Sequence, residues 1–235
     1  MRREVMNVLE ILKRLESYYG PQKPSWPTDP YEFLVWWHCG YPASDIACEK
    51  GWGSLRTKVG IEPRQILAAS NKELTDALRP GGMVPELRTM RLKEIAARVK
   101  DEFGGDLRGW LIGPVNQVGK ILKTFPNIAE PGADRILLFG AIAPVAAVPS
   151  NCPHVLVRIQ RGQERENYGA TYKEAQQAIL LEVADNFDSR IRAYLLLKRH
   201  GQETCKRTKP QCDRCPVNSG CAYFAGKYRG RATIA

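Results

Sequence analysis

The sequence predicts an all-α protein, for three reasons. Apolar residues recur every three or four positions, as in Val8, Leu12 and Leu15, which is the spacing of one helix face. Helix-capping patterns are frequent, and Ser70-x-x-Glu73 and Thr171-x-x-Glu174 both have the form of a capping box. No segment of alternating apolar and polar residues has a second such segment to pair with, so a β-sheet is not expected.

Proline, glycine and capping residues divide the first half of the chain into helices. The first helix is expected over residues 2–19 and ends at Gly20-Pro21, and a proline-rich linker follows to Pro27. Asp29 and Pro30 begin a helix through His38 that is apolar on nearly every face, so we expect it to be buried. Further helices are expected from 44 to 59, from 63, from 72 and from 85 to 103.

The second half of the chain continues the helical pattern after Gly104-Gly105. Helices are expected over 115–124, 131–143, 171–185 and 188–200. Thr171 and Asp188-Ser189 are the expected start signals of the last two of these helices. The segment Val155 to Ile159 resembles a strand when taken alone, but all its neighbours are helical, so we assign it to a helix.

Composition favours a globular protein that binds a polyanion. The 235 residues carry a formal net charge of +10, and nucleic acid is the commonest partner of so basic a domain. No apolar run approaches the roughly 20 residues of a membrane span. Because the N-terminus has no signal-peptide pattern, we expect a cytoplasmic protein, associated with the nucleoid if the source is prokaryotic.

Four of the seven cysteines lie close together near the end of the chain. Cys205, Cys212, Cys215 and Cys221 have the spacing C-x6-C-x2-C-x5-C, which indicates a metal centre held by thiolates. A four-thiolate zinc site usually uses two short pairs, whereas this motif has one short pair flanked by single cysteines. The spacing therefore favours a [4Fe-4S] cluster. Cys39, Cys48 and Cys152 are expected to be buried free thiols.

The loop between the first two of these cysteines is basic. Lys206, Arg207 and Lys209 all fall within it. A loop fixed at both ends and carrying several cations is suited to binding the phosphates of a nucleic acid backbone. We therefore include these three residues among the expected DNA contacts.

The segment from Leu195 to Cys215 resembles the cluster loop of endonuclease III and its relatives, the helix-hairpin-helix DNA glycosylases of base excision repair. It matches them in cysteine spacing, in the preceding His200-Gly201 and in Lys209-Pro210. The resemblance extends over most of the chain, from Met6 to Tyr223. It implies a six-helix domain carrying the hairpin at 29–143, and a cluster domain built from 1–28 and 144–235.

The resemblance also implies a helix-hairpin-helix element that contacts a DNA phosphate through backbone N–H groups. The family's Leu-Pro-Gly-x-Gly turn corresponds here to Phe125-Pro126-Asn127-Ile128-Ala129. Asn127 replaces the first glycine and can adopt a left-handed conformation. Ala129 replaces the second glycine, and we expect it to be strained. The hairpin is expected to form but to hold phosphate less well.

Both catalytic residues that the resemblance implies are absent. The lysine that attacks the sugar C1′ in bifunctional members corresponds to Pro131, so imine chemistry at that position is excluded. The aspartate that most members use corresponds to Pro149, in an alignment that also matches Arg158 to a family arginine. The glutamine that fills the gap left by an extruded base corresponds to Pro42. A lyase of the family type is therefore not expected.

Four other side chains are candidates for the missing catalytic group: Glu130, Asp134, Asp45 and His154. One carboxylate near the sugar could stabilise a developing oxocarbenium ion and orient water. The competing interpretation is structural, because Glu130 and Asp134 lie in the first turn of a helix, where acids offset the helix dipole, and Asp45 is also a capping residue.

Two further features bear on DNA recognition. The segment around Met83 resembles the loop that wedges into the duplex in the family, and Met83 is either that wedge or a residue that anchors the loop in the core. Trp36, Trp37 and Tyr41 could line a base pocket, although core packing is expected for at least one of the tryptophans.

Three functions remain open on sequence grounds. The first is a monomeric, monofunctional DNA glycosylase acting on damaged double-stranded DNA with a rearranged catalytic group. The second is a non-catalytic module that recognises bent or damaged duplex. The third is a [4Fe-4S] redox protein without a DNA role, against which the basic cluster loop argues.

Overall fold

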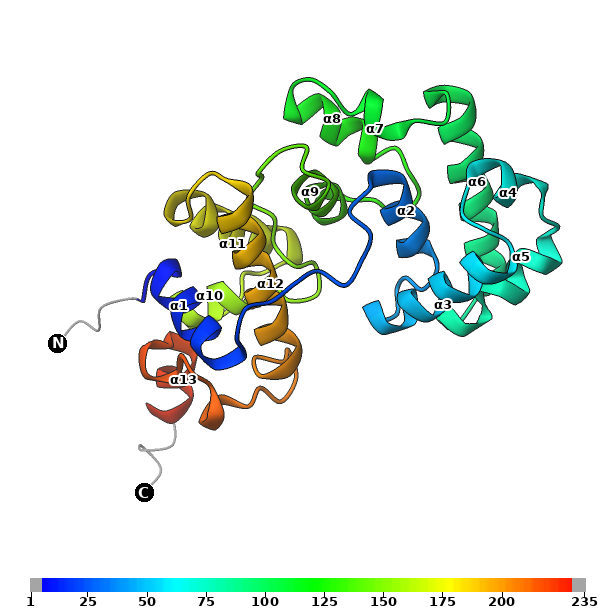
Figure 1. Cartoon of the computed structure of the whole chain (residues 1–235). Helices are drawn as coiled ribbons and strands as arrows, with labels where there is room; N and C mark the ends of the chain where they lie inside the picture. The colour runs from blue at the N-terminus through cyan, green and yellow to red at the C-terminus, as the bar shows by residue number, and fades with distance from the viewer. Residues whose placement is uncertain (1–5, 230–235) are drawn as a thin grey trace. The chain divides into compact units, whose positions relative to one another are not determined.

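The computed structural model describes residues 6–229. Every regular element in this range is helical, so the predicted all-α fold is confirmed (Figure 1). The chain divides into two compact units, one made of 1–24 and 143–235 (unit 1) and the other of 25–142 (unit 2). The sequence placed these boundaries at 28/29 and 143/144. Within the described range no helix is long and apolar enough to cross a membrane.

Unit 2 is built around one long helix, α6, which packs against α2, α4, α5 and α7. The predicted caps form: Asp29 accepts from the N–H of Tyr31 at 2.9 Å, and Ser70 and Glu73 make the reciprocal capping box. The elements are α2 (Pro30–His38), α3 (Asp45–Lys58), α4 (Pro63–Ala68), α5 (Asn71–Leu78), the 3-10 helix η1 (Arg79–Gly81), α6 (Pro85–Phe103), α7 (Leu107–Trp110), α8 (Val115–Leu122) and α9 (Glu130–Phe139).

Unit 1 joins the beginning and the end of the chain. Helix α1 packs against α11 and α12, and α10 packs against α11, α12 and α13, so residues far apart in sequence share one apolar core. The elements are α1 (Val8–Tyr19), α10 (His154–Arg161), α11 (Tyr168–Glu182), α12 (Phe187–Glu203), the 3-10 helices η2 (Cys212–Arg214) and η3 (Asn218–Gly220), and α13 (Ala222–Arg229).

Two predicted helix starts are wrong, for the same physical reason. Helix α11 begins at Tyr168, because Asn167 caps it, and the Thr171 hydroxyl donates to the Asn167 carbonyl inside the first turn at 3.0 Å. Helix α12 begins at Phe187, because Asn186 accepts from the N–H of Ser189 at 2.9 Å. An asparagine upstream of each predicted cap is thus the true cap. The short helix α7 and the C-terminal α13 were not predicted.

The N-terminal helix is shorter in the structure than the helix predicted over 2–19. Helix α1 begins at Val8, after the cap Asn7, and residues 2–5 of the expected helix lie outside the described residues. The assignment of Val155 to Ile159 to a helix is confirmed, since these residues lie in α10. Cys39, Cys48 and Cys152 are buried and free of disulfides, as predicted.

A buried arginine inside an aromatic box joins α9 to α2. The guanidinium carbon of Arg135 lies 3.8 Å from the ring centroid of Trp26 and 5.0 to 5.6 Å from those of Phe33, Trp36 and Trp37. Such cation–π contacts gain strength when they are desolvated. Trp36 is part of the core because it is fully buried, as expected for at least one of the two tryptophans.

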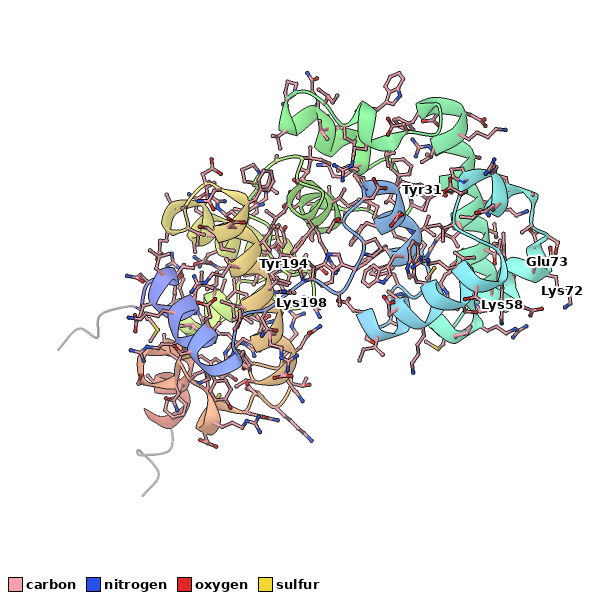
Figure 2. All side chains as sticks on the ribbon, viewed as in Figure 1. Tyr31, Lys58, Lys72, Glu73, Tyr194 and Lys198 are labelled. Carbon is pink, nitrogen blue, oxygen red and sulfur yellow. The ribbon has the colours of Figure 1, made fainter. Side chains whose placement is uncertain are left out.

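Two polar side chains fasten α2 to its surroundings. The Tyr31 hydroxyl, labelled in Figure 2, donates to the carbonyl of Ile61 at 2.7 Å. The ring nitrogens of the buried His38 lie 2.7 Å from the Leu34 carbonyl and 2.9 Å from the Pro126 carbonyl. Burial lowers the pKa of His38 to about 4, so the ring is neutral and its single N–H donates to one of these two carbonyls. The ring lies between α2 and the turn that joins α8 to α9.

Alanine substitutions at two glycines of α3 are expected to change the free energy of unfolding in opposite directions. A Cβ on Gly51 would overlap the Cys39 carbonyl, whereas a Cβ on Gly53 would meet nothing within 4 Å. Gly51→Ala is therefore expected to lower the free energy of unfolding by about 1–3 kcal/mol. Gly53→Ala is expected to raise it by roughly 0.5–1 kcal/mol, because alanine favours the helix. Urea unfolding measures both, and equal responses would contradict the packing described between α3 and Cys39.

His38 predicts a loss of stability in mild acid. Its pKa is about 4 in the folded protein against a reference value of 6.5, so the unfolded chain binds its proton first as the pH falls. The contribution of His38 is present above pH 6.5 and is lost as the pH falls towards 4, to an extent on the order of 3 kcal/mol.

Unfolding of the wild type and of His38→Gln over this pH range measures the contribution. The difference in free energy of unfolding between the two proteins should shrink as the pH falls. A difference that stays constant from pH 7 to 4 would show that His38 is not the titrating group.

Candidate functional site

The four clustered cysteines surround one pocket in unit 1. Cys205 follows α12, Cys212 and Cys215 bracket η2, and Cys221 precedes α13, and all four line the same pocket. Burial raises the pKa of Cys205 to about 12 and that of Cys215 to about 11. These sulfurs are thus thiols in the metal-free protein, and a metal centre would bind them as thiolates with release of protons.

The donor set of this pocket fits a sulfur-ligated metal centre. Thiolates are the soft ligands that zinc and iron–sulfur clusters use, and four of them converge here from 17 residues of chain. Among residues 6–229, however, no three His, Cys, Asp or Glu side chains are close enough together to hold a single metal ion. The structure therefore brings the predicted ligands to one pocket without forming a mononuclear site.

Helix α10 holds the backbone of the basic loop. The guanidinium of Arg158 donates to the carbonyls of Lys206 and Arg207, each at 3.1 Å, and Nε2 of His154 lies 2.8 Å from the Cys205 carbonyl. These contacts fix the main chain of the loop from one side. Its predicted phosphate-binding side chains can then extend into solvent.

The cations of the loop are exposed, but they are not equivalent. Lys206, Arg207 and Lys209 are all exposed. Arg207 already pairs with Glu164 at 2.7 Å, and Glu164 also binds Arg158 at 2.6 Å. Lys209 adopts a left-handed backbone with φ of 56°. The loop thus presents two lysines and a partly neutralised arginine.

The predicted hairpin is present between α8 and α9 in unit 2. Asn127 has the left-handed φ of 53° that the sequence analysis expected. Ala129 does not have the expected strain, because its φ of −96° and ψ of −174° are ordinary extended values. It serves as the N-cap of α9, a position that takes extended backbone angles from any residue. The second glycine is therefore not needed for this turn.

The tip of the hairpin presents unsatisfied backbone donors. Within the described residues, the N–H groups of Asn127, Ala129 and Glu130 have no backbone acceptor, while that of Ile128 donates to the Phe125 carbonyl at 3.2 Å. The side chain of Ile128 is buried and anchors the tip. Open N–H groups beside a helix N-terminus form a favourable environment for an anion such as a phosphate.

Two arginines of α6 brace this turn. Arg98 donates to the Thr124 carbonyl at 2.6 Å and lies over the Phe125 ring at 4.6 Å. With the Asn127 amide oriented so that its oxygen faces α6, that oxygen accepts from Arg91 at 2.6 and 3.1 Å. Because Asn127 carries the left-handed conformation, Arg91 stabilises the residue on which the turn depends.

The loop at the start of α6 is strongly apolar and exposed. Met83 is 86% exposed, and Val84, Leu87 and Met90 are also exposed, so the alternative that Met83 anchors the core is wrong. Val84 has a left-handed φ of 53°, which is unusual for a β-branched residue and costs on the order of 1–3 kcal/mol. Strain of this kind is concentrated at functional sites and persists only where the surrounding structure holds it.

The candidate catalytic residues lie in two different units. Glu130 is exposed and accepts from Lys123 at 2.7 Å, and Asp45 pairs with the buried Arg135 at 3.6 Å. Asp134 is 6% exposed in α9, one turn after Pro131 and therefore on the same helix face. His154 is buried in unit 1, where it contacts the cysteine loop.

The aromatic residues of α2 and of the turn that follows it differ in exposure. Trp36 is buried in the core, whereas Trp37 and Tyr41 are partly exposed and stack on each other, with centroids 4.5 Å apart and an interplanar angle of 23°. Within the described residues, the buried indole N–H of Trp37 has no hydrogen-bond partner. Trp37 and Tyr41 thus cover part of each other's rings, and Trp37 also stacks on Phe33.

Several side chains that position these elements were not predicted from the sequence. His38, Arg88, Arg91 and Arg98 are the main examples. A histidine in an otherwise apolar helix was the available signal for His38. The arginines recur at helical spacing on one side of α6, but without the fold that side could not be distinguished from a solvated face.

Of three comparisons with known proteins, only the one with solved structures finds matches. No protein-family model and no curated protein matches it. Several solved structures match over nearly the whole chain. Two are DNA complexes of endonuclease III, one a trapped covalent intermediate and one non-covalent, each with a TM-score of 0.74 and 17% identity. Each match covers 95% of this chain. It covers 100% of the endonuclease III chain in the covalent intermediate and 99% in the non-covalent complex.

Two further matching structures are named as DNA glycosylases. A thermostable thymine-DNA glycosylase matches with a TM-score of 0.72 and 18% identity, covering 93% of this chain and 97% of its own. The H. pylori 3-methyladenine DNA glycosylase bound to 1,N6-ethenoadenine matches with a TM-score of 0.62 and 18% identity. It covers 84% of this chain and 98% of its own.

All four structures match this chain in overall fold, with TM-scores from 0.62 to 0.74. The agreement extends over more than nine-tenths of the chain in the first three, at identities that establish the fold alone. The chain has the fold of the helix-hairpin-helix DNA glycosylases of the endonuclease III type.

Proposed function

We propose that this protein is a DNA-binding protein of base excision repair, a monofunctional DNA glycosylase that releases a damaged base without cleaving the strand. The observation that carries the proposal is the hairpin with open backbone donors, in a fold shared with DNA glycosylases over 95% of the chain. The protein is expected to act as a monomer on double-stranded DNA in the cytoplasm.

Three features are proposed to contact DNA, two in unit 2 and one in unit 1. The hairpin supplies N–H donors for a phosphate, the loop at the start of α6 supplies Met83 as an apolar wedge, and Lys206, Arg207 and Lys209 supply cations. Apolar side chains inserted at a base step unstack it and bend the duplex. Phosphate contacts supply the salt-dependent part of the affinity.

The proposed absence of lyase activity rests on Pro131. This residue lies in the first turn of α9, and its tertiary amide nitrogen cannot attack a sugar carbon to form an imine. Pro149, at the position of the other family catalyst, is a buried loop residue without an ionisable group. The proposal therefore relies on hydrolysis assisted by another of the candidate side chains, Glu130, Asp134, Asp45 or His154.

Asp134 is the candidate acid that its surroundings favour. It lies one helical turn from Pro131 and is buried, whereas Glu130 is exposed and bound to Lys123. A carboxylate in a desolvated site can stabilise a developing oxocarbenium ion and orient the attacking water. The substrate expected of such a reduced catalytic apparatus is a base with a weak glycosidic bond, such as an alkylated purine.

The cysteine pocket is proposed to hold a [4Fe-4S] cluster through Cys205, Cys212, Cys215 and Cys221. The support is the presence of four thiols on one pocket and the motif spacing. When bound, the cluster would cross-link the loop and α13 to α12. Its proposed role is structural, since it orders the basic loop for contact with phosphates.

The two prolines favour one alternative. A scaffold that keeps the hairpin and the apolar loop but has proline at both catalytic positions would serve as a recognition module for damaged or bent duplex. It would bind an abasic-site duplex tightly and release no base.

A panel of lesion-containing duplexes tests the activity. It should include uracil, hypoxanthine, alkylated purines, oxidised pyrimidines, mismatches and an abasic site, with hot alkali to reveal released bases. We expect cleavage at one lesion, and a rate lowered by about 10²- to 10⁴-fold in Asp134→Asn. Glu130→Gln tests the second acid.

Asp101→Asn, an exposed acid of α6, is the matched control and should keep the wild-type rate. Release of base at an unchanged rate in both Asp134→Asn and Glu130→Gln would exclude these carboxylates. Tight binding with no release from any duplex would establish the recognition module instead.

Cys212→Ser tests the role of the cluster. We expect the variant to lose the visible brown absorbance and at least about tenfold in DNA affinity, because the basic loop loses its cross-link. Cys48→Ser is the control, since Cys48 is buried in unit 2, and it should keep both properties. Full DNA affinity in a colourless Cys212→Ser protein would separate the cluster from DNA binding.

A further inference from the structure

A continuous row of polar side chains leads from α1 to the cysteine pocket. The hydroxyl of Tyr19 lies 2.6 Å from Oγ1 of Thr204 and 3.0 Å from Nδ1 of His200. Nε2 of His200 lies 3.7 Å from Sγ of Cys215. His200 is completely buried and lines the pocket with Thr204 and Cys215. All four residues belong to unit 1.

The chemistry of these groups permits one direction of donation when Cys215 is a metal ligand. A ligating thiolate can only accept, so Nε2 of a neutral His200 must carry the ring proton. Nδ1 then accepts from the Tyr19 hydroxyl. The Tyr19 oxygen in turn accepts from the Thr204 hydroxyl, so every donor in the row has one acceptor.

The contacts of Cys205 and Cys221 differ from the contact between His200 and Cys215. His154 contacts the main-chain carbonyl of Cys205 and not its sulfur. Sγ of Cys221 is paired with the carbonyl of Arg158 at 3.8 Å, an acceptor that cannot donate to a thiolate. Arg158 is a cation beside Cys205. His200 thus offers Cys215 a neutral N–H in a fixed orientation.

We propose that His200 donates a hydrogen bond from Nε2 to the sulfur of Cys215 in the cluster-loaded protein, and that Tyr19 fixes the ring tautomer that makes this possible. The inference rests on the proposed [4Fe-4S] cluster. His200 is then a positioning residue that tunes the cluster. A hydrogen bond to a ligand sulfur stabilises the more negatively charged, reduced cluster and so raises its reduction potential.

The test is the reduction potential of the cluster in purified, full-length protein. Iron content and visible absorbance are measured first, and the midpoint potential is then measured by spectroelectrochemistry. His200→Leu should load with iron and show a lower potential than the wild type. His200→Gln, which keeps an N–H donor, should restore part of the shift.

Two further variants test the row of polar side chains that leads from Tyr19 to Cys215. Tyr19→Phe keeps the ring packing but removes the hydroxyl that fixes the tautomer, so its potential should also fall. His38→Gln changes a buried histidine of the other unit and should leave the potential unchanged. Tyr19→Phe decides the question if His200→Leu does not fold.

The outcomes distinguish this inference from the proposed cofactor. Equal potentials in the wild type, His200→Leu and Tyr19→Phe, at equal iron content, would overturn the hydrogen bond while leaving the cluster in place. Wild-type protein that carries no iron and no visible absorbance after anaerobic reconstitution would overturn both.

Discussion

The buried guanidinium of Arg88 is the contact on which the organisation of unit 2 depends. Arg88 is 2% exposed, and it donates to the carbonyl of Cys39 at the end of α2 and to that of Gly82, at 2.6 Å, before the exposed apolar loop. Hydrogen bonds from a charged group are each worth about 1.5–3 kcal/mol, and buried carbonyls without a donor are costly. A Cβ on Gly81 would overlap the Cys39 carbonyl, so the loop can approach α2 this closely only with glycine there.

Helix α6, which carries Arg88, also holds the hairpin between α8 and α9. Arg88, Arg91 and Arg98 are three and seven positions apart and therefore lie along one face of α6. The first holds the loop with Met83, and the other two hold the turn at Thr124 and Asn127. Both proposed DNA contacts of unit 2 are thus fixed to one rigid helix. The loop with Met83 and the hairpin turn are thus both hydrogen-bonded to α6.

The sequence predicted the elements well where local chemistry decides them, and poorly where distant contacts decide. Caps such as Asp29 and Ser70 act within one turn, so they could be found directly. Ala129 was misjudged because its extended backbone follows from its role as the cap of α9. The four cysteines could be grouped by spacing, but the approach of Tyr19 to His200 joins residues 181 positions apart. The buried arginines of α6 could not be distinguished from surface charge, because only the fold shows which carbonyls they reach.

We propose that this scaffold binds DNA although proline stands at 131 and 149, the two positions where the resemblance to the endonuclease III family implies a catalyst. Hydrogen–deuterium exchange with and without an abasic-site duplex tests it most directly. Amides of the hairpin at 127–130, of the loop at 82–84 and of the basic loop at 206–209 should become protected on binding, and the protection should fade as salt rises. Protection confined to other segments, or none under conditions where DNA is bound, would contradict the account.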